Sequence, residues 1–226
     1  MSPYEHALLA HLAGQWLSEA RWARFNEVLG ERTRHVTVVL DNLHQLHNAS
    51  AVMRSCEAMG VQDLHMVLRA EGLRGERGIA MGAEDWLTSH TYEGADATSD
   101  CVQSLRKRGY RLVATTPHTE DYRLDELPLD QPVALLFGQE KPGLSDELLA
   151  AADAHMYIPM QGFAESLNVS VSVALCLYEC LSRLRASDID WRLGRDERSE
   201  IALSWARRTI QHVGEVEARF AANNLG

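Results

Sequence analysis

The sequence predicts an α/β fold in which a parallel sheet is covered by helices on both faces. Segments with helical apolar spacing alternate along the chain with short, continuous apolar runs. Strands that are buried on both faces have this character, and helical connections between them make neighbouring strands parallel. Polar loops follow three of the predicted strands. Ligands of such sheets bind beyond the carboxyl ends of the strands, so these loops are the expected site.

The strands are predicted from short runs of aliphatic and β-branched residues bounded by turn signals. In chain order they occupy residues 36–40, 64–68, 111–115, 133–137 and 156–159. Gly60, Gly109 and Pro117 lie at the borders of these runs, and runs this short favour strands over helices. Residues 69–82, which are rich in glycine and arginine, predict a loop.

The helices are predicted from apolar residues at helical spacing between the strands. They occupy residues 3–29 (weakened in the middle by Gly14), 48–59, 98–108, a stretch beginning after Ser145, 167–184, and a final helix at 197–222. Asn48 and Ser50 are expected to cap the second of these helices, and Gly60 to end it. Ser145 is expected to cap another, with two acidic residues in its first turn.

The composition limits the class of protein. The 226 residues are 46% hydrophobic, which suffices for one substantial core with small terminal additions. The formal net charge of −10 argues against nucleic-acid binding through bulk charge, but not against a local basic patch. Arginines gather near the two ends, at Arg21, Arg24, Arg32 and Arg34 and at Arg183, Arg185, Arg192 and Arg195. No apolar run approaches the roughly 18 residues of a membrane helix, and the start has no apolar signal core. The expected location is the cytoplasm.

The cysteines and histidines predict neither disulfides nor a metal centre. The four cysteines, Cys56, Cys101, Cys176 and Cys180, form no C-x-x-C pair and are expected to be free thiols. His44 and His47 are three residues apart, but no nearby carboxylate or cysteine completes a ligand set. No metal site is therefore expected.

Three common kinds of site are disfavoured by the motifs. Residues 138–145 nearly match a phosphate-binding loop, but Leu144 stands where the essential lysine is required. No G-x-G-x-x-G motif follows a predicted strand, so a dinucleotide site is not supported. There is no G-x-S-x-G elbow, and Ser166 and Ser170 have no evident histidine and aspartate partners, which disfavours a hydrolase.

The three polar loops together resemble the motifs of one known family. The first is Asn48-x5-Arg54 followed by Glu57-Ala58-Met59-Gly60-Val61, and the second is Leu136-Phe137-Gly138-Gln139-Glu140-Lys141-Pro142-Gly143-Leu144-Ser145. The third runs from Ile158-Pro159-Met160-Gln161-Gly162 to Ser166-Leu167-Asn168-Val169-Ser170. In this order they resemble the three motifs of the SpoU/TrmH family of SPOUT RNA 2′-O-ribose methyltransferases. The resemblance covers about residues 33–185.

The resemblance implies a fold, a cofactor and a substrate. The fold is a SPOUT-type parallel sheet flanked by helices, with a deep trefoil knot near the C-terminus. Residues 31–185 would form the methyltransferase domain, with helical extensions at 1–30 and 186–226. The family implies S-adenosyl-L-methionine, a homodimer and an RNA partner. Transfer RNA is the expected substrate, with guanosine 18 of the D-loop as the target. Methylation of ribosomal RNA, or a family member that binds RNA without catalysis, are the alternatives.

Site residues follow from the resemblance by position. The residues expected to act in catalysis are Arg54, Asn48, Glu140, Ser166 and Asn168. Those expected to hold the cofactor, through their backbones, are Thr115, Gly138, Ile158, Met160 and Leu167. A guanidinium keeps its proton and is a poor base, so Arg54 is expected to organise a substrate phosphate, and the proton to leave through that phosphate or a water. Structural roles stay open: helix capping for Asn48, Ser166 and Asn168, and pairing with Arg54 or Lys141 for Glu140.

Overall fold

The structure is a computed structural model that describes residues 1–224 apart from residues 44, 70–81, 119–120 and 141. The loop predicted at 69–82 therefore lies, beyond its two ends, outside the described residues, as do His44 and Lys141. The chain divides into two compact units: Thr33–Trp191, and Met1–Arg32 together with Arg192–Gly226.

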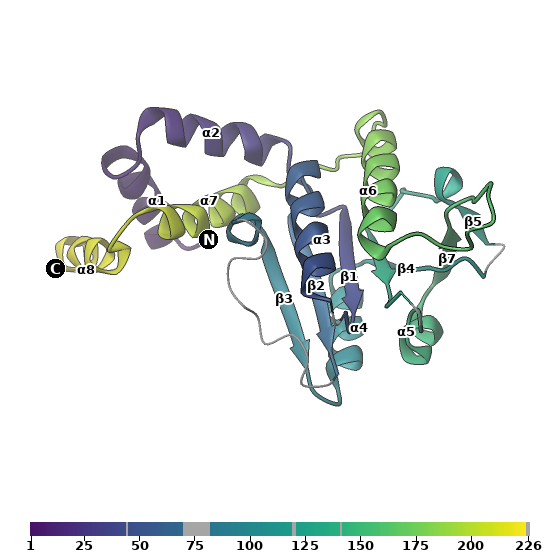
Figure 1. The fold of residues 1–226 in the computed structure, drawn as a ribbon. Coiled ribbons are helices and arrows are strands. Elements are labelled where there is room, and N and C mark those ends of the chain that lie inside the picture. The colour runs from purple at the N-terminus through teal and green to yellow at the C-terminus, as the bar shows by residue number, and fades with distance from the viewer. Residues whose placement is uncertain (44, 70–81, 119–120, 141, 225–226) are drawn as a thin grey trace. The chain divides into compact units, whose positions relative to one another are not determined.

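The larger unit is built on a seven-stranded sheet (Figure 1). In chain order its strands are β1 (Val36–Asp41), β2 (Asp63–Leu68), β3 (Thr88–Glu93), β4 (Arg111–Thr115), β5 (Tyr122–Arg123), β6 (Val133–Phe137) and β7 (Ala154–Tyr157). Their order across the sheet is β3-β2-β1-β6-β4-β7-β5, and all six pairings between neighbours are parallel. The carboxyl ends of β6, β4 and β7, which are neighbours, therefore lie along one edge.

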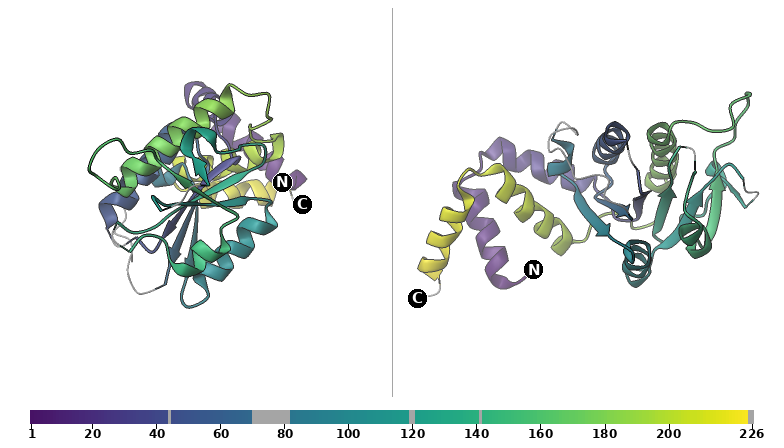
Figure 2. Two further views of the ribbon diagram at one scale, coloured as in Figure 1. Left: turned by 90° about the vertical axis from the view of Figure 1, so that its right-hand side faces the viewer. Right: turned by 60° about the horizontal axis from the view of Figure 1, so that its bottom comes forward.

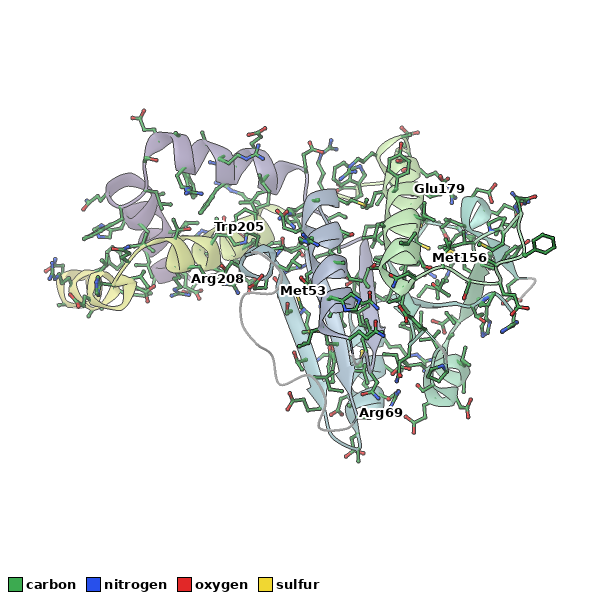
Figure 3. All side chains as sticks on the ribbon, in the orientation of Figure 1. Met53, Arg69, Met156, Glu179, Trp205 and Arg208 are labelled. Atoms are coloured by element: carbon green, nitrogen blue, oxygen red, sulfur yellow. The ribbon has the colours of Figure 1, made fainter. Side chains whose placement is uncertain are left out.

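Helices cover both faces of this sheet (Figure 2). On one face α3 (Leu46–Met59) and α6 (Val169–Arg185) pack over a core that includes Val38, Leu135 and Cys176. Met156 of β7 belongs to this core and Met53 of α3 packs against it (Figure 3). On the other face, α4 (Ala97–Lys107) and α5 (Asp146–Ala151) bury a second apolar cluster. Two 3₁₀ turns, η1 (Ala83–Asp85) and η2 (Leu124–Glu126), connect these elements.

The smaller unit is made of helices from both ends of the chain. They are α1 (Pro3–Gln15), α2 (Glu19–Gly30), α7 (Arg195–Thr209) and α8 (Val213–Asn224). Ser2 and Glu5 form a capping box at the start of α1, with Pro3 in the first turn, where its missing N–H costs nothing. Phe25 of α2 meets Trp205 of α7 edge to face, with ring centroids 5.4 Å apart.

The predicted parallel α/β architecture is confirmed, but two edge strands escaped prediction. β3 reads Thr-Ser-His-Thr-Tyr-Glu and alternates between half-buried and exposed positions, so it has no apolar run. β5 has only two residues. Both lie at the ends of the sheet, where one side of the strand has no neighbour and less apolar surface is needed.

Helix boundaries differ from the prediction. The helix predicted at 3–29 is divided into α1 and α2. The single helix predicted at 197–222 is wrong, because the chain breaks between α7 and α8 and His212 adopts a left-handed backbone with φ of 54°. Asn48 and Ser50 do not cap α3, which begins at Leu46 after Gln45. Asn48 lies inside the first turn, and its side chain is directed to other partners. Ser145 does cap α5, accepting from the N–H of Leu148.

The described helices and cysteines add two simple facts. None of the helices in the described part of the chain has the length and apolar character of a segment that crosses a bilayer. All four cysteines are free and buried. Burial raises the pKa of the Cys101 and Cys180 thiols to about 12, so they are protonated and unreactive at neutral pH.

Candidate functional site

A pocket of about 400 Å³ lies beyond the carboxyl ends of β4, β6 and β7. The five residues predicted to hold a cofactor all line it: Thr115, Gly138, Ile158, Met160 and Leu167. They come from three loops that are far apart in the sequence and meet because the three strands are neighbours. This is the place where parallel sheets bind ligands.

The walls of this pocket suit a ligand that binds to backbone groups of the protein. The loop after β6 closes on itself through two hydrogen bonds of 3.0 Å between Gln139 and Gly143. A Cβ atom on Gly138 would overlap the backbone of Gly143 and Leu144, so only glycine fits there. The buried Oγ1 of Thr115 has no hydrogen-bond partner among the described atoms, which leaves a polar group available to a ligand.

Beside the pocket, three predicted residues form one hydrogen-bonded cluster. The Glu140 carboxylate accepts from Asn48 Nδ2 at 3.0 Å and from Asn168 Nδ2 at 2.7 Å. Asn168 also donates to Asn48 Oδ1, at 3.2 Å, while its own Oδ1 caps α6 by accepting from Ser170. The cluster joins α3, the loop after β6 and the start of α6. The three motifs therefore converge in space, and capping is only one part of the role of Asn168.

Ser166 and Arg54 occupy different places relative to the pocket. Ser166 lines it, directly before Leu167. Arg54 is exposed on α3, and it is not among the described residues that line the pocket of its own chain. Ala51 and Ser55, on either side of Arg54 along the helix, instead line an apolar groove between α3 and α6.

Several arginines that could have formed a basic patch are engaged inside the fold. Arg32 is buried, and its guanidinium lies 5.5 Å from the Trp205 ring centroid. Arg34 forms an ion pair with Asp63 at 3.2 Å. Arg183 donates to two backbone carbonyls, and Arg185 donates to that of Met59. Arg32 and Arg34 therefore do not form the local basic patch that the sequence left open.

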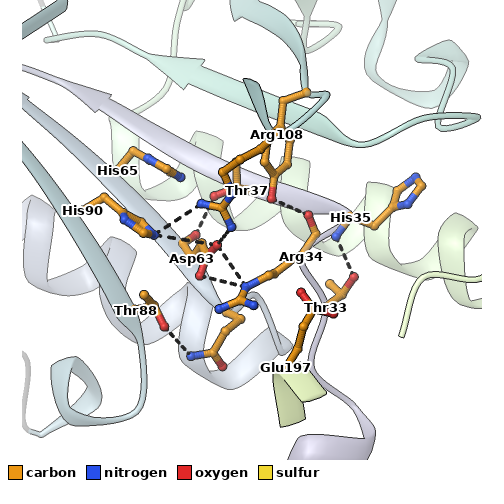
Figure 4. A network of polar contacts seen from close by, with 12 residues as sticks. Thr33, Arg34, His35, Thr37, Asp63, His65, Thr88, His90, Arg108 and Glu197 are labelled. Atoms are coloured by element: carbon orange, nitrogen blue, oxygen red, sulfur yellow. Dashed lines mark hydrogen bonds and ion pairs between the residues drawn. The ribbon is translucent and has the colours of Figure 1, made fainter. Parts of the chain in front are cut away.

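A second polar cluster surrounds Asp63 at the start of β2 (Figure 4). The fully buried Asp63 pairs with Arg34, with Arg108 and, at 3.7 Å, with His90. Asp63, His65 and His90 bring three potential metal ligands together. However, the Arg108 guanidinium contacts both Asp63 and His90, and the His65 and His90 rings are stacked with their centroids 4.5 Å apart. We interpret the cluster as a buried ion-pair network in which arginine supplies the cation.

The pKa values in this cluster follow from burial and charge. Burial raises the pKa of Asp63, but the His90 hydrogen bond and the charges of Arg34 and Arg108 outweigh it and hold that pKa well below its usual value. Burial, reinforced by His90 and Arg108, lowers the pKa of His65 to about 3. Histidine in an unfolded chain has a pKa of about 6.5. Between these values the unfolded state binds the extra proton, so stability falls as the pH falls.

Replacing His65 with glutamine should therefore make the protein less sensitive to acid. Between pH 7.5 and pH 5 the neutral, buried His65 costs the wild type about 2 kcal/mol of unfolding free energy, because only the unfolded chain is protonated there. Urea unfolding at several pH values should show that the free energy of unfolding of wild type, relative to that of His65→Gln, falls by that amount from pH 7.5 to pH 5. The exposed His47 provides the matched control, in the variant His47→Gln. A constant gap for His65→Gln would contradict the assignment.

The structure adds residues that were not predicted for the site. Glu165 and His118 line the pocket. Arg69, labelled in Figure 3, pairs with the buried Asp41 at 2.6 Å and donates to Ser145 Oγ, while Asp41 accepts from the Ser145 N–H. These contacts tie the ends of β1 and β2 to the start of α5. The charged residues that directly follow the predicted strands 36–40 and 64–68 were the available signal.

The chain is similar to known proteins of one family. The model of the SpoU rRNA Methylase family matches residues 35–178. A tRNA (guanosine(18)-2′-O)-methyltransferase from Borreliella burgdorferi is 34% identical over 203 residues, which is 90% of this chain and 92% of the relative.

Solved structures resemble the fold as well. The A. aeolicus TrmH/SpoU tRNA modifying enzyme superposes with a TM-score of 0.73 and 32% identity, over 84% of this chain and 96% of that one. AviRb from Streptomyces viridochromogenes, a SpoU methyltransferase solved in complex with the cofactor AdoMet, gives a TM-score of 0.60 and 27% identity over 71% of this chain and 62% of its own. Since the family model matches more than half of the chain and the relatives cover most of it, this chain belongs to the SpoU methylase family.

Proposed function

We propose that this protein transfers a methyl group from S-adenosyl-L-methionine to a ribose 2′-hydroxyl of tRNA, with guanosine 18 of the D-loop as the target. The observation that carries the proposal is the convergence of three motif loops on one pocket, with the Asn48–Glu140–Asn168 cluster at its side. The relative from Borreliella burgdorferi, named for this reaction, supports the choice of substrate. Residues 31–185 would carry the reaction in the cytoplasm, with helical extensions at 1–30 and 186–226.

The pocket residues suit the cofactor. When bound, S-adenosyl-L-methionine supplies a methyl group on a positively charged sulfur. The unpaired Thr115 Oγ1 and the backbones of Ile158, Met160 and Leu167 would hold its polar parts, and the close loop at Gly138 would lie against it. Backbone groups bind through N–H and C=O groups that every such residue carries, so the residues that hold the cofactor can have side chains of different kinds.

Replacing Gly138 with alanine should abolish cofactor binding. The added methyl group would overlap the Gly143 and Leu144 backbone and force the loop after β6 open. Isothermal titration calorimetry should show a loss of affinity of at least about a hundredfold, which corresponds to roughly 3 kcal/mol. Gly162→Ala is the matched control, because nothing lies within 4 Å of a Cβ there. Wild-type affinity in Gly138→Ala would remove this loop from the cofactor site.

On the substrate side, each residue is given a positioning role. Glu140, held by Asn48 and Asn168, forms a rigid wall beside the pocket, and Ser166 offers a hydroxyl within it. Such a wall would hold the ribose close to the methyl donor, and this alignment is a major source of rate in group transfer. Arg54 would bind the phosphate next to the target, and the 2′-hydroxyl proton would leave through that phosphate or a water.

We further propose that the protein is a homodimer with a deep trefoil knot in its C-terminal part. The knot is implied by the family resemblance. The dimer is supported by the groove between α3 and α6, where Val171, Leu175 and Tyr178 leave 46%, 42% and 67% of their surface exposed. Apolar side chains gathered on one helix face favour a partner surface, and C2 dimers are the commonest assemblies. In such a dimer, Arg54 of the second copy would supply the arginine that is not among the described residues lining the pocket.

Introducing a charge into this groove should break the dimer. Tyr178→Asp places a carboxylate among apolar side chains, and its folding should be unaffected because the residue is largely exposed in the single chain. Light scattering should give a dimer for wild type and for Tyr178→Phe, but a monomer for Tyr178→Asp. The monomer should also lose methyl transfer. A wild type that is monomeric at micromolar concentration would contradict the dimer.

The function is tested by labelled methyl transfer into purified tRNA and into ribosomal RNA fragments. Transfer into tRNA that disappears when guanosine 18 is replaced supports the proposal, and transfer into ribosomal RNA alone would replace tRNA as the substrate. Mass spectrometric mapping of ribose methylation in RNA from cells that lack the protein independently distinguishes tRNA from ribosomal RNA as the substrate. If calorimetry detects no cofactor binding, an RNA-binding protein without catalysis becomes the better description.

A further inference from the structure

The loop between β7 and α6 carries two side chains to which the proposed reaction assigns no role. Phe163 is fully exposed, at 109% of its reference surface. Glu165 lines the pocket and is exposed, and no hydrogen bond or ion pair to another described residue engages it. Glu140, the other pocket carboxylate, is instead held by two amides. A fully exposed aromatic ring thus lies two residues before an unengaged carboxylate that lines the pocket.

Their chain positions keep both residues near the pocket wall. Ser166 and Leu167 follow directly and line the same pocket. Consecutive Cα atoms are 3.8 Å apart, so the Cα atoms of Phe163 and Glu165 lie within about 11 Å of that of Ser166. A nucleotide whose ribose enters the pocket must place its base near this loop.

The chemistry of the two side chains matches a guanine base. Proteins that read unpaired bases stack aromatic rings on the base face and hydrogen-bond to its Watson–Crick edge. Guanine presents two donors on that edge, N1–H and N2–H, and an ionised carboxylate offers only acceptors. Adenine presents an acceptor at N1, which a carboxylate repels.

We propose that Phe163 and Glu165 form the base-recognition element of this enzyme, in which the ring stacks on the target base and the carboxylate accepts from the N1–H and N2–H of guanine. This inference rests on the proposed function, because it assumes an RNA nucleotide in the pocket. It adds the residues that select the base. Both are specificity-determining residues, since neither is required to touch the reacting oxygen.

The test exchanges the hydrogen-bonding character of Glu165. A glutamine amide accepts from the N6–H of adenine and donates to its N1, so Glu165→Gln should favour adenine. With tRNA transcripts that carry guanosine, inosine or adenosine at the target, wild type should prefer guanosine over adenosine, with inosine intermediate because it lacks the N2 amine. Glu165→Gln should lower the guanosine-to-adenosine ratio of kcat/KM by about ten- to a hundredfold. Glu93→Gln, an exposed carboxylate on β3, is the charge-matched control and should keep the ratio.

The aromatic residue is tested by separating KM from kcat. Phe163→Ala should raise the KM for tRNA about 5- to 150-fold with little change in kcat, and Phe163→Trp should restore it, because stacking needs only a flat ring. Cofactor affinity and molar mass should stay at their wild-type values in every variant.

Four results would overturn the inference: an unchanged base ratio in Glu165→Gln, weaker cofactor binding in that variant, dissociation of a wild-type dimer in Phe163→Ala, or no rescue by Phe163→Trp. If wild type methylates no tRNA, the proposed function fails by itself. The inference is then judged by whether the tRNA carrying guanosine binds more tightly than the one carrying adenosine, and equal binding ends it.

Discussion

Arg54→Ala is expected to lower methyl transfer to tRNA by at least about a hundredfold while the urea unfolding midpoint stays unchanged. Arg54 is exposed on α3, so truncating it costs little folding energy. In our proposal its guanidinium holds the phosphate next to the target ribose, and losing one preorganised charge contact of this kind typically costs 10²–10³ in rate. Single-turnover kinetics with saturating cofactor measure the effect. Arg54→Lys should retain part of the activity, because it keeps the charge but loses the two-pronged donor. Lys107→Ala, on the exposed side of α4, serves as control.

A mixed dimer shows which copy supplies this arginine. One subunit carries Arg54→Ala and its partner carries Asn168→Ala. If Arg54 acts across the dimer, one of the two sites retains both residues and the mixed dimer shows about half of the wild-type activity. If Arg54 acts within its own chain, both sites are damaged and the mixed dimer is inactive. An active homodimer of Arg54→Ala would exclude the residue from the reaction altogether.

Asp63→Ala is expected to reduce the free energy of unfolding by about 3–5 kcal/mol, because it leaves the charges of Arg34 and Arg108 without their buried partner. Asp63 has no exposed side-chain surface and connects β2 with Arg34, which precedes β1, and Arg108, which follows α4. Urea unfolding monitored by tryptophan fluorescence measures the loss. The control is Asp130→Ala, which removes the ion pair between Asp130 and Arg111. The Asp130 side chain is 72% exposed, so this substitution should reduce the free energy of unfolding by less than about 1 kcal/mol.

The stability of Asp63→Ala at pH 7 also tests our interpretation of the Asp63 cluster as an ion-pair network. If Asp63→Ala is as stable as wild type, the ion pairs contribute nothing net. If zinc titration stabilises the wild type by more than about 1 kcal/mol, the metal-binding reading of Asp63, His65 and His90 must be restored. Cofactor binding should be unaffected in either case, since Asp63 begins β2 and the pocket lies beyond the carboxyl ends of other strands.

The sequence predicted those parts of the fold whose signal is local and apolar. β4 and β6 were predicted with the bounds that the structure gives, because a buried central strand must be a continuous apolar run. β3 could not be found in this way, since an edge strand with alternating half-buried positions needs no such run. The break between α7 and α8 depends on a left-handed His212, and nothing in the residue types around it demands one.

The sequence motifs predicted which residues belong to the site, but not the contacts between them. That Thr115, Gly138 and Ile158 share a pocket follows from motif order and strand adjacency. Asn48 was expected to cap its helix, but two of its side-chain partners lie 92 and 120 residues away, and such distances cannot be read from local pattern. The same holds for Arg34, which reads as a surface cation until the buried Asp63 beside it is known.

The unit built from both chain ends has a consequence for how the protein is made. Leu8, Leu12 and Phe25 leave the ribosome well before α7, against which α1 and α2 pack. During synthesis these apolar side chains must wait for about 170 residues, or roughly 10–30 seconds at common translation rates. In that interval the nascent N-terminal helices present an apolar surface to chaperones, and a chain released before α7 would keep it permanently.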